Sequence, residues 1–204
     1  MPSSLSATEA GIAERSEWRA AVGQPAEIAR VMGRYADLAV VAQAPQDGFE
    51  PMNGPRPEDL LFGCGRPVLM VPRYGDFPRM GDHVLVAWNG SAEASRAVHD
   101  AFPFLAQARK VTILSVNPDA DETGDLPGAD IARHLARHGI DVVVTRTDGR
   151  DIDTSDVLLN FAADEAADLL VMGGYGHSRL REFAFGGVTR SILRTATLPV
   201  LMAH

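Results

Sequence analysis

The chain has 204 residues, of which 46% are hydrophobic and 23% are charged. This length suits one or two domains and this composition suits a packed core, so a mainly disordered chain is excluded. Acidic residues outnumber basic residues by 27 to 19, which gives a formal net charge of −8 at pH 7. Because nucleic-acid binding depends on clustered positive charge, we expect no nucleic-acid partner.

The sequence also lacks the marks of a secreted or membrane-bound protein. Cys64 is the single cysteine, so neither an intramolecular disulfide nor a cysteine-based metal site is available, and a reducing compartment is expected. Residues Met1–Ser6 have neither the basic start nor the apolar centre of a signal peptide. The longest apolar runs, Leu38–Ala42 and Val84–Trp88, are far shorter than the ~20 residues that cross a bilayer. We therefore expect a cytoplasmic protein with no membrane partner.

The N-terminal part of the chain predicts two helix–strand pairs. A helix at Pro25–Tyr35 leads into the apolar run Leu38–Ala42, and a helix at Pro57–Phe62 leads into Val68–Val71. Short continuous apolar runs are typical of strands in a parallel sheet that is covered on both faces. The segment Tyr74–Gly81 contains two glycines and a proline and is expected to form a linker.

Beyond this linker, strands and helices alternate in the pattern of βαβ units, which predicts a doubly wound α/β sheet. The predicted strands are residues 83–88, 111–116, 140–146, 168–173 and 198–203. The predicted helices are residues 91–105, 129–138, 154–166 and 187–195. Ser91 is expected to cap the first of these helices, and Gly139 is expected to end the second. Together they make a complete small domain with a mainly parallel, five-stranded sheet.

The N-terminal part repeats the end of this domain. The matching segments, offset by about 131 residues, are Ala36–Val41 with Ala167–Met172 and Arg66–Met70 with Leu198–Met202. Glu14–Val22 is a weaker counterpart of the strand at Ile140–Thr145. The repeat predicts two units, a partial half domain at residues 1–78 and a complete domain at residues 79–204.

A glycine-rich segment begins at the end of the fourth strand of the complete domain. It contains Gly173, Gly176, Gly186 and Gly187, and the helix at 187–195 follows directly. In open α/β sheets, ligands bind outside the carboxyl ends of the strands. Glycines let backbone N–H groups approach a phosphate, and a helix N-terminus favours an anion. The segment therefore predicts a phosphate cradle, with a plain turn and helix start as the alternative.

The glycine spacing, with two residues between Gly173 and Gly176 and nine before Gly186, resembles the nucleotide-binding signature of the universal stress protein family. The strand and turn at Val84–Ser91 and the closing strand at Leu198–Met202 are also similar to that family. The resemblance spans residues 80–204 as a full domain and 5–73 as a partial one. The chain thus looks like a tandem-domain member with an incomplete first domain.

This resemblance implies a Rossmann-like sheet with strand order 3-2-1-4-5 and pairing of the last strands across a twofold axis. Such pairing would join Val68–Val71 to Val200–Ala203 within one chain, as an intramolecular pseudo-dimer, or would form a homodimer. In the N-terminal unit, Ala42–Pro45 stands where the complete domain has its first glycines. We therefore expect no nucleotide in the N-terminal unit, which would serve as a pairing partner.

The resemblance further implies an adenine nucleotide as ligand, namely ATP, ADP or AMP, with or without magnesium. The implied adenine and ribose contacts are Ala87, Asn89, Ser115 and Val116, and the implied phosphate contacts are Gly173, Gly176, Gly186, Gly187 and Val188. Two of these depart from the family's pattern, because Asn89 replaces the usual Asp and Gly187 the usual Ser or Thr. An amide forms hydrogen bonds but offers a metal no carboxylate. The expected function is stress-response or signalling by nucleotide binding, with no catalytic residue. The alternatives are a non-binding interaction module and, less favoured, a weak ATP hydrolase.

Other motifs are interpreted as structural. Asp119–Asp130 has the spacing of a calcium loop, but it follows a strand rather than a helix, so an acidic surface loop is favoured. His134 and His138 are spaced like zinc ligands on a helix, but the sequence offers no evident third ligand. His177 is expected at the surface of the glycine-rich segment, and Cys64 is expected to be a small buried hydrophobic residue.

Overall fold

The computed structural model describes residues 11, 13–45, 54–117, 128–149, 151–175 and 187–204. Its strands are β1 (Ala39–Ala42), β2 (Val68–Val71), β3 (His83–Ala87), β4 (Lys110–Val116), β5 (Val142–Thr147), β6 (Leu169–Gly173) and β7 (Val200–Ala203). Its helices are η1 (Ala13–Arg15), α1 (Pro25–Gly33), α2 (Pro57–Gly63), α3 (Ala92–Asp100), α4 (Phe102–Leu105), α5 (Ala129–Ala136), α6 (Thr154–Asp164) and α8 (Val188–Thr195).

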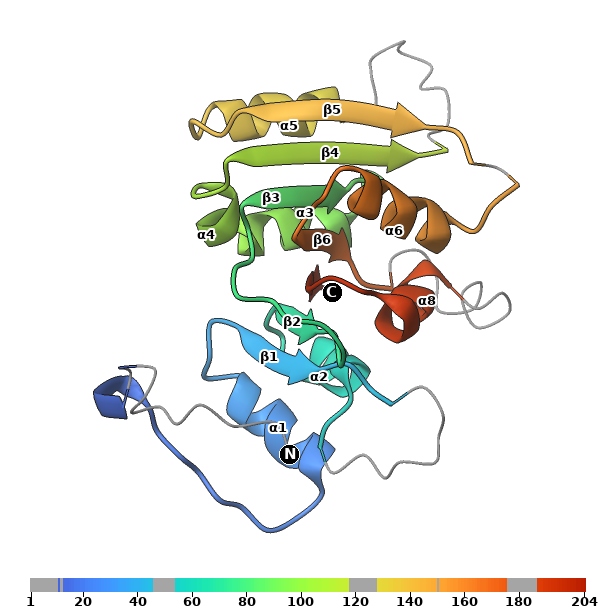
Figure 1. Ribbon diagram of the computed structural model, residues 1–204. Helices are drawn as coiled ribbons and strands as arrows, with labels where there is room; N and C mark the ends of the chain where they lie inside the picture. The colour runs from blue at the N-terminus through green and yellow to red at the C-terminus, as the bar shows by residue number, and fades with distance from the viewer. Residues whose placement is uncertain (1–10, 12, 46–53, 118–127, 150, 176–186) are drawn as a thin grey trace.

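All seven of these strands form one continuous sheet in the order β1-β2-β7-β6-β3-β4-β5 (Figure 1). Neighbouring strands are parallel except β2 and β7, which run antiparallel with Val68 opposite Met202 and Met70 opposite Val200. The predicted α/β class and mainly parallel sheet are confirmed. The predicted five-stranded sheet is corrected, because β1 and β2 extend the sheet beyond β7. The order 3-2-1-4-5 therefore does not describe the whole sheet and holds only for β3 to β7. The remaining five strands lie in the order β5-β4-β3-β6-β7.

The antiparallel pairing of β2 with β7 joins the N-terminal part of the chain to its last strand. Of the two arrangements expected for the last strands, pairing within one chain is the one observed. Both strands are almost wholly buried, and their side chains enter the cores on both faces of the sheet. The division at residue 78 and the internal repeat remain predictions, because the sheet itself runs without a break from β2 to β7.

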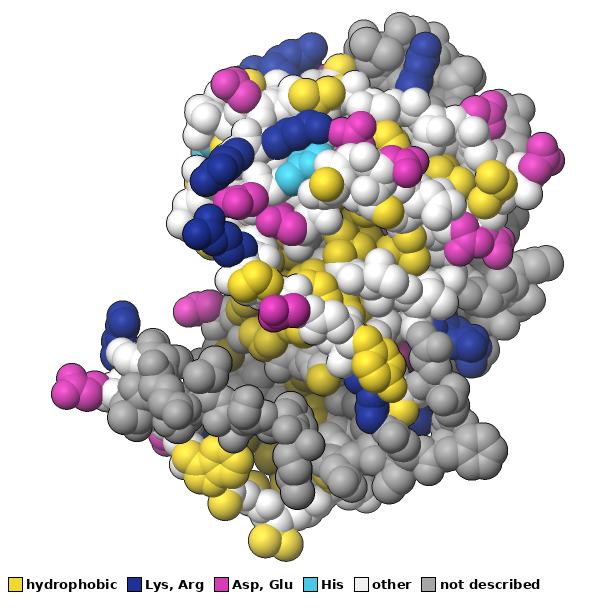
Figure 2. Space-filling model, in the orientation of Figure 1, with side chains coloured by type: hydrophobic (Ala, Val, Ile, Leu, Met, Phe, Trp, Pro, Cys, Tyr) yellow, Lys and Arg dark blue, Asp and Glu magenta, His cyan; other side chains and the backbone are white. Residues whose placement is uncertain are grey.

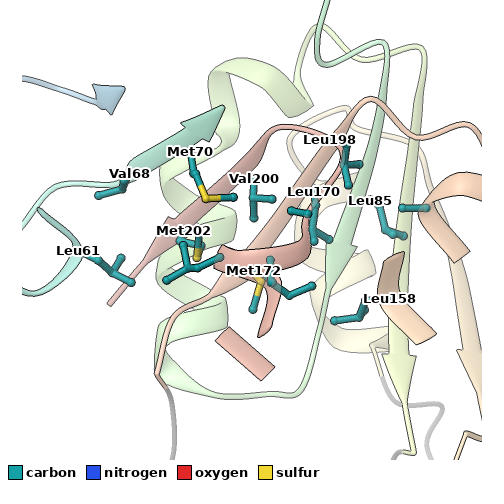
Figure 3. Close-up of a cluster of buried hydrophobic side chains, with 14 of the residues drawn as sticks. Leu61, Val68, Met70, Leu85, Leu158, Leu170, Met172, Leu198, Val200 and Met202 are labelled. Carbon is teal, nitrogen blue, oxygen red and sulfur yellow. The ribbon is translucent and has the colours of Figure 1, made fainter. Parts of the chain in front are cut away.

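Helices cover both faces of the sheet, which accounts for the nearly continuous apolar character of the strands. On one face, α2, α6 and α8 pack against β2, β6 and β7 through a cluster that includes Leu61, Met70, Leu158, Met172, Ile192 and Met202 (Figure 3). On the other face, α3, α4 and α5 pack through a cluster that includes Val86, Ala97, Leu105, Ile113, Leu135 and Val171. The molecule therefore has three layers, with the sheet in the middle.

The helix ends follow the signals in the sequence. Ser91 caps α3, because its Oγ accepts a hydrogen bond of 3.1 Å from the backbone N–H of Ala94. Gly139, with φ of +75°, follows the end of α5. The single helix predicted at residues 91–105 is instead two helices, α3 and α4. The break lies at Ala101, because Pro103 carries no N–H and begins a new helix in its first turn.

One prediction for the N-terminal segment is wrong. Residues 16–22, expected to match a strand, form no regular structure, and a short 3-10 helix precedes them.

Large exposed hydrophobic side chains are concentrated in the N-terminal segment (Figure 2). Eight of the ten in the described part of the chain belong to residues 18–74. The edge strand β1 illustrates this, because Val40 is 63% exposed. The N-terminal segment thus carries most of the large exposed hydrophobic side chains of the described residues.

A carboxylate holds the amino ends of β3 and β6 together. Asp168, which precedes β6, accepts hydrogen bonds from the backbone N–H groups of Gly81, Asp82 and His83 at 2.9 to 3.0 Å. Nearby, Lys110 Nζ lies 2.6 Å from a carboxylate oxygen of Glu165 and lowers the pKa of that carboxyl. These contacts fix where β3 begins and leave the opposite, carboxyl end of the sheet open for a site.

Candidate functional site

A cavity of about 140 Å³ opens at the carboxyl ends of the central strands. The strand residues that line it are Ala87, Trp88, Asn89, Leu114, Val116, Met172 and Gly173, from β3, β4 and β6 and the turn after β3. In this sheet, β3 lies between β4 and β6. The chain passes from β3 to β4 on one side of β3 and later forms β6 on the other side. The cavity therefore lies at the switch point where open α/β sheets bind their ligands.

Two helices complete the wall of this cavity. Thr154 and Leu158 come from the first turns of α6, and Val188 and Thr189 come from the first turn of α8. The two helices are joined by a hydrogen bond of 2.9 Å from Ser155 Oγ to Ser191 Oγ. Because this bond is partly buried, it keeps the two helical walls in register.

The chemistry of the lining is apolar with a few hydrogen-bonding groups. In the described part of the chain, its polar side chains are those of Asn89, Thr154 and Thr189, beside the indole of Trp88, and none carries a charge. Such a surface suits a flat, largely apolar ring that is oriented by a few donors and acceptors. Among the described residues, the lining offers neither a general base nor a carboxylate for a metal ion.

Asn89 shapes the turn between β3 and α3. Its side-chain oxygen accepts a hydrogen bond of 3.1 Å from the backbone N–H of Ser91, and Gly90 between them has φ of +74°. An aspartate could accept the same bond, so the amide preserves the turn. With its oxygen engaged in this way, Asn89 has its NH₂ group to donate toward the cavity.

Gly173 is required by close packing at the end of β6. A Cβ atom at this position would lie 2.6 Å from the backbone nitrogen of Ala94 and 2.8 Å from the carbonyl carbon of Glu93. Both atoms belong to the first turn of α3, which cannot withdraw without moving the helix. The first motif glycine therefore brings the end of β6 against α3, whether or not a ligand is bound.

The start of α8 faces the cavity with backbone N–H groups that have no acceptor within the helix. Gly187 is the N-cap residue, without a side-chain capping bond, and the helical hydrogen bonds begin with Ser191 N–H to the Gly187 carbonyl at 3.1 Å. The N–H groups of the preceding turn have no acceptor within the helix. Thr189, only 2% exposed, accepts a bond of 3.0 Å from Tyr175 N–H. The end of β6 and the start of α8 are thus held together.

The structure brings most of the described site predictions together. Ala87, Asn89, Val116, Gly173 and Val188 line the cavity. Gly187 adjoins it as the N-cap of α8, whereas Gly176 and Gly186 lie outside the described residues. Ser115 is not among the lining residues, because alternation along β4 turns it away from the face that carries Leu114 and Val116. Ser115 is 3% exposed, and its Oγ has no hydrogen-bond partner among the described residues.

Several lining residues were not predicted from the sequence. These are Trp88, Leu114, Thr154, Leu158, Met172 and Thr189. Trp88 could have been found, because it directly follows the predicted contact Ala87. Thr154 and Leu158 lie one helical turn apart and carry no signal of their own, since only the packing of α6 against the sheet brings them to the site.

The other motifs remain peripheral. Cys64 is 4% exposed within the core, which confirms its interpretation as a buried hydrophobic residue. The rings of His134 and His138 lie 5.0 Å apart on the surface. Across the described residues, no group of three or more His, Cys, Asp or Glu side chains could hold a metal ion. His177 and most of Asp119–Asp130 lie outside the described residues.

In the N-terminal unit, the position after β1 is occupied by Gln43 rather than by glycine. Its side chain donates to the Ala196 carbonyl at 3.2 Å and accepts from Arg73 N–H at 3.3 Å. Gln43 thus joins the N-terminal segment to the segment after α8.

No helix among the described residues is long and apolar enough to cross a membrane.

Comparison with known proteins places this chain in a family. Residues 80–204 match the sequence model of the Universal stress protein family. The chain is 28% identical over 179 residues to the universal stress protein Slr1230 of Synechocystis sp., covering 84% of this chain and 56% of that protein. The chain therefore spans little more than half the length of this curated relative.

Solved structures show the same fold. A universal stress protein from Archaeoglobus fulgidus superposes with a TM-score of 0.69 at 22% identity, covering 89% of this chain and 67% of that one. Among the family's solved structures is a universal stress protein in complex with cAMP, which aligns with 60% of this chain and 97% of its own, at 24% identity and a TM-score of 0.46. From the match over residues 80–204, this chain belongs to the universal stress protein family.

Proposed function

We propose that the cavity at the ends of β3, β4 and β6 binds an adenine nucleotide, ATP, ADP or AMP, and that the chain acts in stress response or signalling through this binding. The proposal rests on one observation: the apolar cavity lies beside the N-terminus of α8, at the switch point of the sheet. Binding would shift the protein toward the conformation or partner that recognises the nucleotide-bound form.

The surface of the cavity supports an aromatic base. A cavity of about 150 Å³ holds a benzene ring in another protein, so this one, at about 140 Å³ and open to the surface, has room for one ring of the base within it. Ala87, Val116 and Leu158 offer apolar contacts from three different elements. The NH₂ group of Asn89 and the hydroxyl of Thr154 can orient the base or ribose by hydrogen bonds.

The phosphates would extend toward α8. The N–H groups of its first turn, which have no acceptor within the helix, and the positive end of the helix dipole favour an anion there. Gly187 adds a backbone donor without a side chain in the way, and Gly176 and Gly186 are proposed to contribute further N–H groups. In this proposal Val188 lies at the junction of base and phosphate, and a magnesium ion would be held by the phosphates.

Binding without turnover is favoured over hydrolysis. The described lining has no ionisable side chain to activate water, and Asn89 offers a metal ion no carboxylate. The second candidate is a non-binding interaction module of the same fold, which the replacements at Asn89 and Gly187 favour. For either function, the β2–β7 pairing supports an intramolecular pseudo-dimer, with a homodimer as the alternative.

The test is calorimetric titration of the protein with ATP and AMP, with and without magnesium. We expect micromolar or tighter binding of one nucleotide per chain. Ala87→Ile should abolish nucleotide binding, because the larger side chain fills the cavity from β3. The thermal midpoint of this variant should stay unchanged or rise, because a cavity is filled. Ala106→Ile, at an exposed position after α4, is the matched control and should bind normally.

Two results would reject the proposal. Absence of binding heat with the wild-type protein would favour the non-binding module. Unchanged affinity in a folded Ala87→Ile variant would show that the nucleotide binds elsewhere. Release of phosphate from ATP at a rate that depends on magnesium would revive the hydrolase alternative.

A further inference from the structure

Helix α2 of the N-terminal segment packs against the residues that follow β6. The ring of Phe62 lies 4.6 Å from the ring of Tyr175, measured between centroids, at an angle of 46°. The neighbouring Leu61 packs so closely on Gly174 that a Cβ atom there would lie 2.6 Å from its Cδ2. The chain that leaves β6 toward the candidate site therefore rests on two side chains from α2.

His204 completes this contact from the other end of the chain. Its Nδ1 donates to the Gly174 carbonyl at 3.0 Å, and its ring meets the ring of Phe62 edge-on at 5.0 Å. Gly174 N–H in turn donates to the Ala203 carbonyl at 2.8 Å. Gly174 and Tyr175 are thus held between α2 and the strand β7.

Tyr175 contacts both Phe62 and a residue that lines the cavity. Its φ of +55° is a left-handed conformation that a bulky residue adopts only when its surroundings hold it. Two contacts do so, namely the ring of Phe62 and the bond from its N–H to Thr189 Oγ1. Thr189 is itself a lining residue at the start of α8. Phe62, Tyr175 and Thr189 form a continuous chain of contacts from the N-terminal segment to the site.

This chain reaches one wall of the cavity. Thr189 belongs to the first turn of α8, where the phosphates are proposed to bind. The proposed base wall is built from Ala87, Val116 and Leu158, which belong to β3, β4 and α6. A change at Phe62 should therefore act on phosphate binding more than on base binding.

We propose that Phe62 is a positioning residue for the nucleotide site, acting through Tyr175 and Thr189, so that phosphate affinity depends on the N-terminal segment; this rests on the proposed function. The dependence is reciprocal, since a nucleotide that binds better when α2 is docked must stabilise that docking equally. The N-terminal segment, which is expected to bind no nucleotide itself, thereby acquires a regulatory role.

The test uses tryptophan fluorescence in a Trp18→Phe background. Trp18 is 93% exposed and is the only tryptophan besides Trp88, which lines the cavity and then reports binding alone. ATP and adenosine are titrated into this protein with Phe62 intact and into its Phe62→Ala, Phe62→Leu and Phe62→Tyr variants. Phe62 is 42% exposed, so its truncation leaves the core in place. Tyr35→Ala, at an 86% exposed position of the same segment, is the control.

We expect Phe62→Ala to weaken ATP about tenfold, within the range typical of coupled sites, and adenosine less than twofold. Phe62→Leu should fall in between, and Phe62→Tyr should restore ATP binding, because it keeps the ring. Equal weakening of ATP and adenosine, or unchanged ATP affinity in folded variants, would overturn the positioning role. Failure of the protein with intact Phe62 to bind either ligand would reject the proposed function itself and this inference with it.

Discussion

At the scale of single residues, Gly173 is the position where the motif and the packing demand the same residue. Gly173→Ala would place a methyl group against backbone atoms of Ala94 and Glu93, which belong to a helix and cannot rotate away. We expect the free energy of unfolding to fall by about 2 kcal/mol or more, as overpacking of a core does. Urea denaturation measures this loss.

The matched control is Gly54→Ala. A Cβ atom at Gly54 would meet no described residue within 4 Å, so its substitution should change stability by less than ~0.5 kcal/mol. If Gly173→Ala were as stable as Gly54→Ala, the close contact between β6 and α3 would be wrong. Nucleotide affinity of the folded Gly173→Ala protein would then report the ligand role of this glycine separately.

The residue scale also shows what sequence reasoning could and could not provide at the site. Glycine spacing located the turn after β6, because glycine is demanded locally by backbone approach. The side of β4 on which Ser115 lies follows from strand alternation, which places Ser115 opposite to Leu114 and Val116. Leu158 could not be predicted as a lining residue, since its place depends on how α6 packs across the sheet.

At the scale of elements, the start of β3 depends on Asp168. Its carboxylate accepts three backbone N–H groups, from Gly81, Asp82 and His83. Bonds to a charged group contribute about 1.5–3 kcal/mol each and are not additive. We therefore expect Asp168→Ala to lower the free energy of unfolding by about 3 kcal/mol, measured by urea denaturation.

Asp164→Ala is the appropriate comparison for Asp168→Ala. Asp164 is an exposed acid on α6, and its loss should cost less than ~0.5 kcal/mol. Equal stability of the two variants would mean that Asp168 does not hold the start of β3. Hydrogen exchange at Asp82 and His83 provides a second readout, because only loss of the carboxylate should expose their N–H groups.

Element boundaries were predictable where the signal is local. The apolar runs marked the strands to within a residue or two, because strands covered on both faces need no polar alternation. The helix expected at residues 91–105 divides at Ala101, since periodicity does not report the effect of Pro103 on the backbone. The pairing of β2 with β7 remained one of two arrangements that the family resemblance implied, because hydrophobic periodicity alone does not report which distant strands pair.

At the scale of the whole molecule, the N-terminal segment and the C-terminal strands share one hydrophobic cluster. Met70 on β2 is completely buried and packs in the same cluster as Val200 and Met202 (Figure 3). Met70→Ala should lower the free energy of unfolding by about 3 kcal/mol. Because the core is shared, the loss should appear in a single cooperative transition by both circular dichroism and Trp88 fluorescence.

Val143→Ala is the control for Met70→Ala, since Val143 is 53% exposed on β5 and should cost little. Two separate transitions in Met70→Ala, one early by circular dichroism and one late at Trp88, would contradict a shared core. They would instead support the division into two units at residue 78.

The most direct measurement for the whole account is a crystal structure of the protein grown with ATP and magnesium. The account predicts the adenine ring between Ala87, Val116 and Leu158, with the phosphates at the start of α8 near Thr189. Phe62 should remain against Tyr175 in that complex. Nucleotide bound at any other place, or an empty cavity at saturating ATP, would contradict the central claim that this cavity is a nucleotide site.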